Sequence, residues 1–226
     1  MRKIFLIISL MVFYPVLDTA VSEEPSGLEV KTDIYSFLNL SQLGLSYEAY
    51  QLAFKGFNKL KSDGKLLNSS ILTIIDFSQS SNNKRMYVLD LYKNVLLYNT
   101  YVAHGKNTGD EFAEKFSNIP GTFQSSLGFY ITENMSIGSK VGLSLILKGL
   151  EKGFNDKARD REIIIHGADY ATEDFIQKHG RLGRSFGCPS LPPDLIKPVA
   201  ETIKDGTCLF IYKHDDNYIH KSTVLN

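Results

Sequence analysis

The pattern of apolar and polar positions divides the chain after residue 45 into one helical stretch followed by short strands. Residues 47–61 carry apolar side chains at spacings of three and four, and Ser46 can cap the first turn, which predicts an amphipathic helix. From residue 66 the pattern changes to short runs of branched and aromatic residues between turn formers. The predicted strands are Ile71–Ser78, Arg85–Tyr92, Asn94–His104, Gly128–Thr132, Leu143–Leu147, Glu162–Ile165 and Cys208–Tyr212.

These elements favour a mainly β fold. The first three strands, joined by short turns, predict an antiparallel meander, and residues 192–206 predict a short helix before the last strand. We therefore expect an antiparallel to mixed sheet shaped as a β-sandwich or barrel, with an N-terminal helix and short crossing helices. Segment 104–140 is rich in glycine, serine and asparagine, and such long segments often carry a binding site or a lid.

The first 22 residues have the layout of a signal peptide. Two basic residues precede an apolar run, residues 4–17, and small residues follow up to residue 22. The run is shorter than the roughly 20 residues that span a membrane, so we expect cleavage, no stable membrane insertion, and a location in the periplasm or cell envelope. An uncleaved membrane anchor is the alternative. The predicted organisation is a signal peptide (1–22), an N-terminal helical preface (23–65), a main domain (66–213) and a polar C-terminal tail (214–226).

The charge of the chain argues against a polyanionic partner. It carries 25 basic and 25 acidic residues, a formal net charge of zero. It has neither the clustered basic face typical of nucleic-acid binding nor the basic amphipathic helix typical of membrane-surface binding. We therefore expect no nucleic-acid partner, and the sequence gives no indication of the oligomeric state.

The chain has only two cysteines, and their surroundings differ. Cys208 lies in GTCLFIY, an apolar run typical of a buried strand, where cysteine acts as a small hydrophobic residue. Cys188 lies in the polar turn RSFGCPS, where Pro189 restricts its backbone. A disulfide between the two is the alternative in an exported chain. We favour free thiols, because a chain of this length can build its core without a cross-link.

A histidine suited to activating the Cys188 thiol ends the strand EIIIHG. His166 stands 22 positions before Cys188. An imidazole helps a thiol to ionise and later returns the proton to the leaving group. The backbone N–H groups of Gly187 and Cys188 can hold the oxyanion of a tetrahedral intermediate. His179 is the second candidate for the base, and His104 is a candidate for lining the same cleft.

A metal site is not expected. The spacings between His166, His179 and Cys188 match no common zinc motif, and no second close pair of ligands is present.

The same residues carry a resemblance to a known family. The stretches IIIHGADY, GRLGRSFGCPSLP, YVAHG and FSNIPGTFQSSLGFY resemble the murein L,D-transpeptidase catalytic domain, in the branch of the YkuD superfamily with a Gly-Cys-Pro active-site turn. The resemblance runs from about Leu45 to Tyr212 and assigns the catalytic domain to residues 66–213. The wider superfamily often has histidine before the Gly-Cys pair and arginine shortly after it, where this chain has Phe186, Pro189 and Ser190.

The resemblance implies a role for each matching residue. Cys188 is the implied nucleophile, His166 the general base, Gly187 a backbone contributor to the oxyanion hole, and Ser185 a polar support. Arg184 is the candidate for binding the substrate's carboxylates, because a guanidinium can bind a carboxylate through two hydrogen bonds. The other candidates for substrate contact are Asp169, Tyr170, His104 and His179. An ordinary surface arginine and a structural turn remain the alternatives for Arg184 and for Asp169–Tyr170.

The implied reaction is acyl transfer on peptidoglycan stem peptides, which would be both donor and acceptor, with no metal or organic cofactor. The acceptor can be a diaminopimelate amine, water, as in an L,D-carboxypeptidase, or a protein lysine. A cysteine peptidase or amidase of the cell wall is an alternative, although in papain-like enzymes the cysteine precedes the histidine. A catalytically silent wall-binding module is the non-enzymatic alternative.

Overall fold

The computed structural model describes residues 33–226. The predicted signal peptide and the first part of the predicted N-terminal preface lie outside the described residues. Within residues 33–226, no helix combines the length and apolar character needed to cross a membrane.

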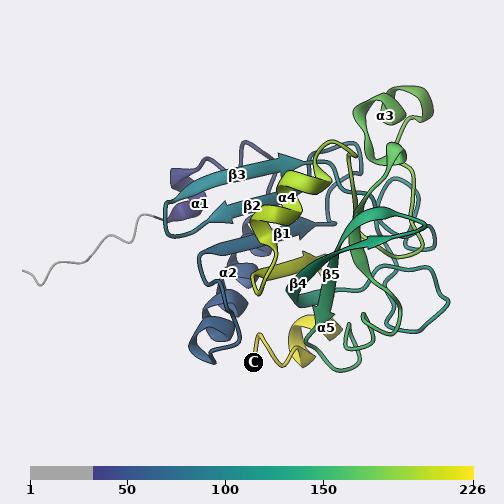
Figure 1. The fold of residues 1–226 in the computed structure, drawn as a ribbon. Coiled ribbons are helices and arrows are strands. Elements are labelled where there is room, and N and C mark those ends of the chain that lie inside the picture. The colour runs from purple at the N-terminus through teal and green to yellow at the C-terminus, as the bar shows by residue number, and fades with distance from the viewer. Residues whose placement is uncertain (1–32) are drawn as a thin grey trace, which may run out of the picture. The chain divides into compact units, whose positions relative to one another are not determined.

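A single eight-stranded mixed sheet forms the centre of the described chain (Figure 1), with the strand order β3-β2-β1-β8-β4-β5-β6-β7. The strands are β1 (Ile71–Asp76), β2 (Met86–Asp90), β3 (Val95–Thr100), β4 (Gly128–Gly138), β5 (Gly142–Gly149), β6 (Ile164–Gly167), β7 (Ser190–Leu191) and β8 (Cys208–Tyr212). All neighbouring pairs are antiparallel except β1–β8 and β6–β7. The predicted meander and the expected antiparallel to mixed sheet are confirmed.

The two ends of this sheet approach each other. Ala103 lies just past β3, the first strand in the order, and Ser190 lies in β7, the last strand. Their backbones exchange two N–H···O bonds of 2.9 and 3.2 Å. The sheet is therefore nearly closed and barrel-like, which confirms the expected fold class.

The helices are short apart from one. They are α1 (Ile34–Phe37), α2 (Tyr47–Ser62), α3 (Glu173–His179), α4 (Ile196–Ile203) and α5 (Asp216–Lys221), with the 3₁₀ helix η1 at Asp169–Ala171. Helix α2 begins as predicted, since the Ser46 side chain accepts a hydrogen bond from the N–H of Ala49. Its buried stripe, which includes Ala53 and Phe57, joins the main hydrophobic core and contacts β1 and β8.

Several segments differ from the sequence prediction: α3 and β7 were not predicted, and β6 begins at Ile164 and not at Glu162. Strand β4 continues to Gly138 and forms a hairpin with β5, although its second half is rich in polar residues. Strand β3 ends at Thr100, so His104 lies beyond the strand that it was predicted to end. The expected polar tail contains α5, whose Tyr218 is buried and donates its hydroxyl to the Glu151 carboxylate over 2.8 Å.

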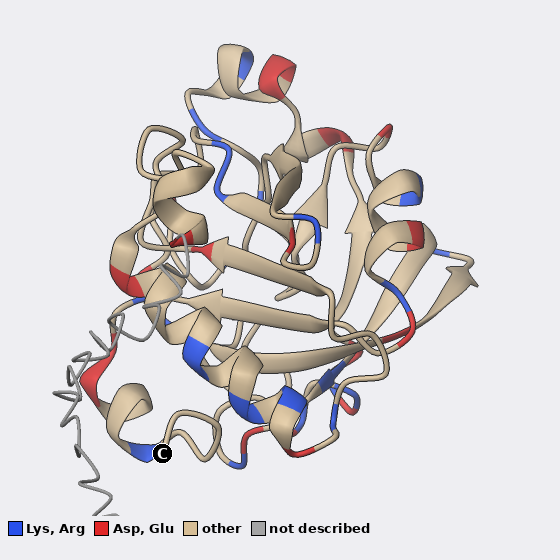
Figure 2. Ribbon diagram, turned by 90° about the vertical axis from the view of Figure 1, so that its left-hand side faces the viewer, with Lys and Arg blue, Asp and Glu red and all other residues tan. Residues whose placement is uncertain are grey.

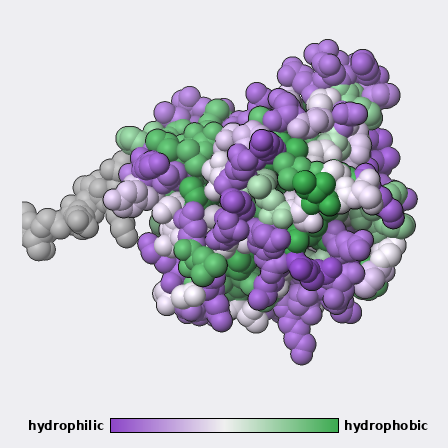
Figure 3. Space-filling model, viewed as in Figure 1, coloured by the Kyte–Doolittle hydropathy of each residue, from purple (hydrophilic) through white to green (hydrophobic). Residues whose placement is uncertain are grey.

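Charged and hydrophobic residues are mixed in the views of the described chain. Figure 2 shows Lys and Arg interspersed with Asp and Glu, in agreement with the zero net charge. On the face drawn in Figure 3, hydrophobic residues lie in separate patches among hydrophilic ones.

Candidate active site

Strand β7 and the turn before it bring the predicted nucleophile close to the predicted base. Strands β6 and β7 are parallel, and His166 is paired with Ser190. Cys188 lies in the bend two positions before Ser190, and the carbonyl of the intervening Pro189 accepts the N–H of His166 over 3.4 Å. The turn that carries Cys188 is therefore held next to His166 at the end of the sheet.

The cysteine turn is held by a network of short hydrogen bonds. The Ser185 hydroxyl donates to the Cys188 carbonyl over 2.6 Å and accepts the Gly187 N–H over 3.0 Å. The Ser125 hydroxyl donates to the Gly187 carbonyl over 3.0 Å. Gly187 has a φ of 124°, and a Cβ there would lie 2.9 Å from the Gln124 carbonyl oxygen, so only glycine fits. Ser185 is thus placed as the polar support of the turn.

Of the two backbone N–H groups predicted to hold an oxyanion, the structure leaves one available. The Gly187 N–H already donates to Ser185, which argues against its predicted role in the oxyanion hole. The N–H of Cys188 donates to no acceptor in the described part of the chain. The candidate donor is therefore the N–H of Cys188 itself.

The surroundings of the Cys188 side chain favour the protonated thiol. Cys188 and Cys208 are both free thiols. The Cys188 sulfur donates to the carbonyl oxygen of Glu162 over 3.5 Å. Burial raises the pKa of the Cys188 thiol, and the Ile164 backbone and the Arg161 guanidinium oppose this rise. The thiol would therefore need to give up its proton during the attack on a substrate.

Both ring nitrogens of His166 have a hydrogen-bond partner, and one of them acts as an acceptor. His166 is 7 % exposed. Its Nδ1 lies 3.0 Å from the Gly167 carbonyl oxygen, which can only accept, so Nδ1 carries the ring proton. Its Nε2 lies 3.1 Å from the Ser190 hydroxyl, which in turn lies 3.0 Å from the Tyr170 hydroxyl. Among residues 33–226, the structure has no hydrogen bond between Cys188 and His166.

The other predicted site residues differ in where they lie. Tyr170 reaches the site through Ser190, and burial raises the pKa of its hydroxyl. His104 is 1 % exposed, so the prediction that it lines the cleft is wrong. Its ring contacts buried residues, and its Nδ1 lies 2.8 Å from Arg85 Nη2. His179 is exposed at the end of α3, where its ring contacts Phe175.

Arg184 and Asp169 are not assembled with the cysteine. The Arg184 guanidinium forms an ion pair with Asp110 and also donates to the carbonyl oxygens of Lys106 and Gly109. It therefore already has a carboxylate partner. Asp169 is exposed in η1, where its carbonyl accepts the Thr172 hydroxyl.

Three residues that contact the site were not predicted from the sequence. Ser190 links His166 to Tyr170, the Glu162 carbonyl accepts the thiol, and Arg161 lies close to the turn. The Arg161 guanidinium donates to the oxygens of Ser117, Ser126 and Gln124, and it has no carboxylate partner among the described residues. Nothing in the local pattern ARDRE marks Arg161, because its position depends on contacts far away in the sequence.

The described residues offer no metal centre. No group of three or more His, Cys, Asp or Glu side chains within residues 33–226 is placed to hold a metal ion.

Comparison with protein families identifies the domain. Residues 41–212 match the model of the L,D-transpeptidase catalytic domain, which is most of the chain. The chain belongs to this family. The resemblance seen in the sequence is therefore confirmed, and Cys188 and His166 both lie inside the matched region. A comparison with curated proteins found no match.

Solved structures similar to this L,D-transpeptidase domain carry the same family name. An L,D-transpeptidase from Mycobacterium smegmatis is 12% identical, with a TM-score of 0.41, and the match covers 64% of this chain and 59% of that one. An Enterococcus faecium L,D-transpeptidase mutant is 14% identical, with a TM-score of 0.39 and coverages of 63% and 50%. One from Stackebrandtia nassauensis is 12% identical, with a TM-score of 0.39 and coverages of 73% and 68%. The chain thus spans between half and about two thirds of these structures.

Proposed function

We propose that this chain is an exported L,D-transpeptidase that transfers acyl groups between peptidoglycan stem peptides through a thioester on Cys188. The observation that carries the proposal is the position of Cys188, in the turn next to the hydrogen-bonded chain Tyr170–Ser190–His166, in a domain of this family. Histidine and cysteine in this arrangement suit nucleophilic catalysis.

The first half of the reaction would form the thioester. The Cys188 sulfur turns from the Glu162 carbonyl and attacks the carbonyl at the L-centre of a diaminopimelate residue, while its proton passes to Nε2 of His166. The bond to the terminal D-alanine breaks, and His166 gives the proton to the departing amine. The free N–H of Cys188 can hold the oxyanion while the tetrahedral intermediate exists.

The second half would transfer the acyl group to an acceptor. A thioester is more reactive than the amide it replaces, so a weak amine nucleophile can attack it. A diaminopimelate amine of a second stem would give a crosslink, water would make the enzyme an L,D-carboxypeptidase, and a protein lysine would attach that protein to the wall. His166 takes the acceptor's proton and returns it to the sulfur when the C–S bond breaks. The proposal needs neither a metal nor an organic cofactor.

The location that we propose is the periplasm or cell envelope. It rests on the signal-peptide layout of residues 1–22 and on the place of the proposed substrate outside the cytoplasm. The intact mass of the protein purified from cells expressing the full chain tests this. We expect the mass of a chain that begins near Glu23, and a full-length mass would overturn the cleavage.

Covalent adduct formation tests the proposed chemistry. Intact mass would be measured after mixing the mature chain with a tetrapeptide stem or a carbapenem, in parallel with Cys188→Ala and Cys208→Ala. We expect an adduct on the native chain and on Cys208→Ala, and none on Cys188→Ala. An adduct that survives Cys188→Ala would overturn the proposed nucleophile. No adduct on a chain with a free Cys188 thiol would favour the wall-binding alternative, which a pull-down with purified walls then tests.

A further inference from the structure

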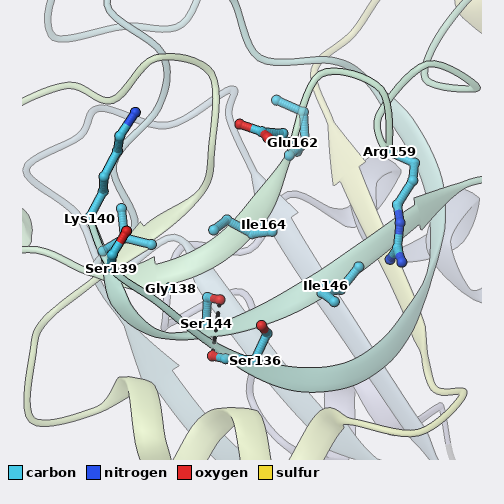
Figure 4. A pocket seen from close by; sticks show the side chains of 11 residues that line it. Ser136, Gly138, Ser139, Lys140, Ser144, Ile146, Arg159, Glu162 and Ile164 are labelled. Carbon is cyan, nitrogen blue, oxygen red and sulfur yellow. Dashed lines mark hydrogen bonds between the residues drawn. The ribbon is translucent and has the colours of Figure 1, made fainter.

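A pocket opens beside the candidate active site (Figure 4), and the chemistry described so far does not use it. It has a volume of about 420 Å³ and lies between the β4–β5 hairpin and segment 159–164. Its lining residues are Ser136, Gly138, Ser139, Lys140, Val141, Ser144, Ile146, Arg159, Glu162, Ile163 and Ile164. This volume falls within the range of roughly 300–1,000 Å³ that is usual for small-molecule sites.

The strands that form the floor of the pocket lie next to the strands that carry His166 and Ser190. The strand register pairs Ser136 with Ser144, Ser144 with His166, and His166 with Ser190. Directly paired residues on neighbouring strands point to the same side of a sheet. Two pocket hydroxyls and the His166–Ser190 pair therefore form one row across four strands.

The pocket borders residues that contact the turn of Cys188, although Cys188 itself does not line it. Glu162 and Ile164 line the pocket, and the carbonyl oxygen of Glu162 is the acceptor of the Cys188 thiol. Ile163 lies against the turn as well, since its Cδ1 would be 3.2 Å from a Cβ on Gly187. A molecule bound in the pocket would thus lie next to a thioester on Cys188.

Two opposite charges face the pocket without an ionic partner. In Figure 4 the Lys140 side chain rises from the hairpin turn, and the Glu162 carboxylate points toward it across the opening. Neither residue takes part in an ion pair among residues 33–226, whereas Arg159 on the far side pairs with Glu133. The pocket therefore offers one free anion and one free cation over a floor of serine and isoleucine.

We propose that this pocket selects the acyl acceptor by binding a zwitterionic amino-acid centre, with its ammonium group on Glu162 and its carboxylate on Lys140. The inference rests on the proposed transferase function and specifies its acceptor. Hydrogen bonds between charged groups are stronger than neutral ones, so a centre that carries both charges gains two such contacts. Water gains neither, and an amine that lacks a neighbouring carboxylate gains only one.

The position of Glu162 connects acceptor binding to the transfer step. An ammonium group held by Glu162 lies on the side of the pocket next to the Cys188 turn and loses one proton to solvent before the neutral amine attacks. As the nitrogen forms the new C–N bond with the thioester carbonyl, its second proton passes to His166, and that proton goes to the sulfur when the C–S bond breaks. The ordered acceptor replaces a bimolecular encounter with an oriented one, which favours aminolysis over hydrolysis.

Partition of the acyl-enzyme measures this selection. The native chain would be acylated with a tetrapeptide stem, and the products formed with ¹³C-labelled D-alanine, D-alanine methyl ester and water would be quantified by mass spectrometry, where the label separates the D-alanine product from the unreacted donor. We expect the native chain to prefer D-alanine over its methyl ester by at least about tenfold. Lys140→Gln should abolish that preference, and Glu162→Gln should shift both amines toward hydrolysis. The products are counted per acyl-enzyme formed, so the comparison does not depend on how fast each variant forms the thioester. Lys93→Gln and Glu201→Gln, which lie outside the pocket, should behave as the native chain. A preference that Lys140→Gln leaves intact would overturn the proposal.

Direct binding separates this inference from the proposed function. The ¹⁵N-labelled Cys188→Ala chain would be titrated with D-alanine, D-alanine methyl ester and D-lactate and followed by NMR. We expect D-alanine to shift the amides of the pocket, with at least about tenfold weaker binding of the two single-charge analogues and of Lys140→Gln and Glu162→Gln. Pocket binding, together with a native chain that forms no thioester with the tetrapeptide stem, would support the pocket and overturn the transferase. A thioester without pocket binding would support the transferase and overturn the pocket.

Discussion

At the scale of single residues, the surroundings of Cys188 favour the protonated thiol over the thiolate. Burial raises its pKa, and its proton is donated to the Glu162 carbonyl. The only cation that the structure places near it is Arg161, which lowers the pKa of the thiol and has no carboxylate of its own in the described chain. Reactivity toward a small electrophile, which follows the thiolate, reports both effects.

The first prediction concerns this ionisation. Alkylation of the unliganded chain by iodoacetamide should rise with pH with a midpoint above that of an ordinary cysteine, because burial favours the neutral thiol. Arg161→Met should move the midpoint further up, since it removes the cation. Rates between pH 6 and 11 measure this, and Arg159→Met, an exposed neighbour in the sequence, is the matched control. A midpoint below that of free cysteine would contradict the claim that burial raises the pKa of the Cys188 thiol.

A second prediction concerns the hydroxyl pair behind His166. Ser190→Ala removes the partner of Nε2, so the ring would lose part of its orientation. We expect thioester formation to slow by roughly ten- to a hundredfold and the pH dependence of acylation to shift, with the fold retained. Tyr170→Phe should have a smaller effect in the same direction, since its hydroxyl acts through Ser190. Tyr98→Phe, which removes a tyrosine hydroxyl on β3, should change neither rate nor pH profile.

At the scale of elements, the C-terminal helix is fixed by one buried carboxylate. Glu151 is 0 % exposed and accepts hydrogen bonds from the N–H of Phe129 and from the hydroxyls of Tyr218 and Ser222. The last two residues belong to α5 and its C-terminal cap. Burial raises the pKa of Glu151 in spite of these donors.

The third prediction follows from the sign of that shift. The folded chain holds the Glu151 proton to a higher pH than the unfolded chain does, so this residue's contribution is fully present below about pH 4 and declines as pH rises through the raised pKa. Glu151→Gln cannot ionise and should remove that decline. Urea unfolding at pH 4.5 and 7.5 measures it. From pH 4.5 to 7.5, the free energy of unfolding of Glu151→Gln should increase relative to that of the native chain, by up to about 1.4 kcal/mol per pH unit. Parallel changes in the two proteins, as expected for Glu201→Gln, would refute the idea.

The sequence pattern correctly predicted those helices and strands whose ends are marked by nearby caps and turns. Helix α2 and strands β1, β2 and β8 lie where the sequence placed them, because their apolar runs are bounded by caps and turns. The second half of β4 was not predicted, since its residues are half exposed and polar, and pairing with β5 supplies the stability. Strand β7 has two residues and exists only through its parallel partner β6.

The sequence could predict only those residues of the candidate site whose own chemistry and immediate neighbours indicate a role. A histidine at a strand end and a cysteine between glycine and proline indicated Cys188 and His166. The roles of Ser190, Arg161 and Glu162 depend on which strands lie side by side, and no local signal carries that information. For His104 the sequence predicted a site residue that the structure does not place at the site. A histidine before glycine gives the same local pattern whether its ring faces a cleft or the core.

At the scale of the whole described chain, the closure of the sheet depends on a buried Arg85–His104 pair. Arg85 is 0 % exposed and donates to the carbonyl oxygens of Val102 and Gln79 and to Nδ1 of His104. Because arginine can only donate, Nδ1 of His104 accepts, and its Nε2–H is directed to the Gly109 carbonyl over 3.2 Å. The backbone carbonyl of His104 accepts the N–H of Ser185 over 2.9 Å, so this pair supports the cysteine turn.

The fourth prediction is that this pair limits stability in acid. Burial and the neighbouring Arg85 cation lower the pKa of His104 to about 3, so the folded chain keeps the ring neutral while the unfolded chain protonates it near pH 6.5. The contribution of His104 is therefore present above that pH and declines as pH falls, by up to about 2 kcal/mol at pH 5. His104→Asn keeps an acceptor near Arg85 but cannot titrate. Its free energy of urea unfolding should be lower than that of the native chain at pH 7.5 and should change less down to pH 5. This decline is opposite in sign to that of Glu151, so the two variants should diverge over the same pH range. An equal acid decline in the native chain and in His104→Asn would place the sensitive group elsewhere in the molecule.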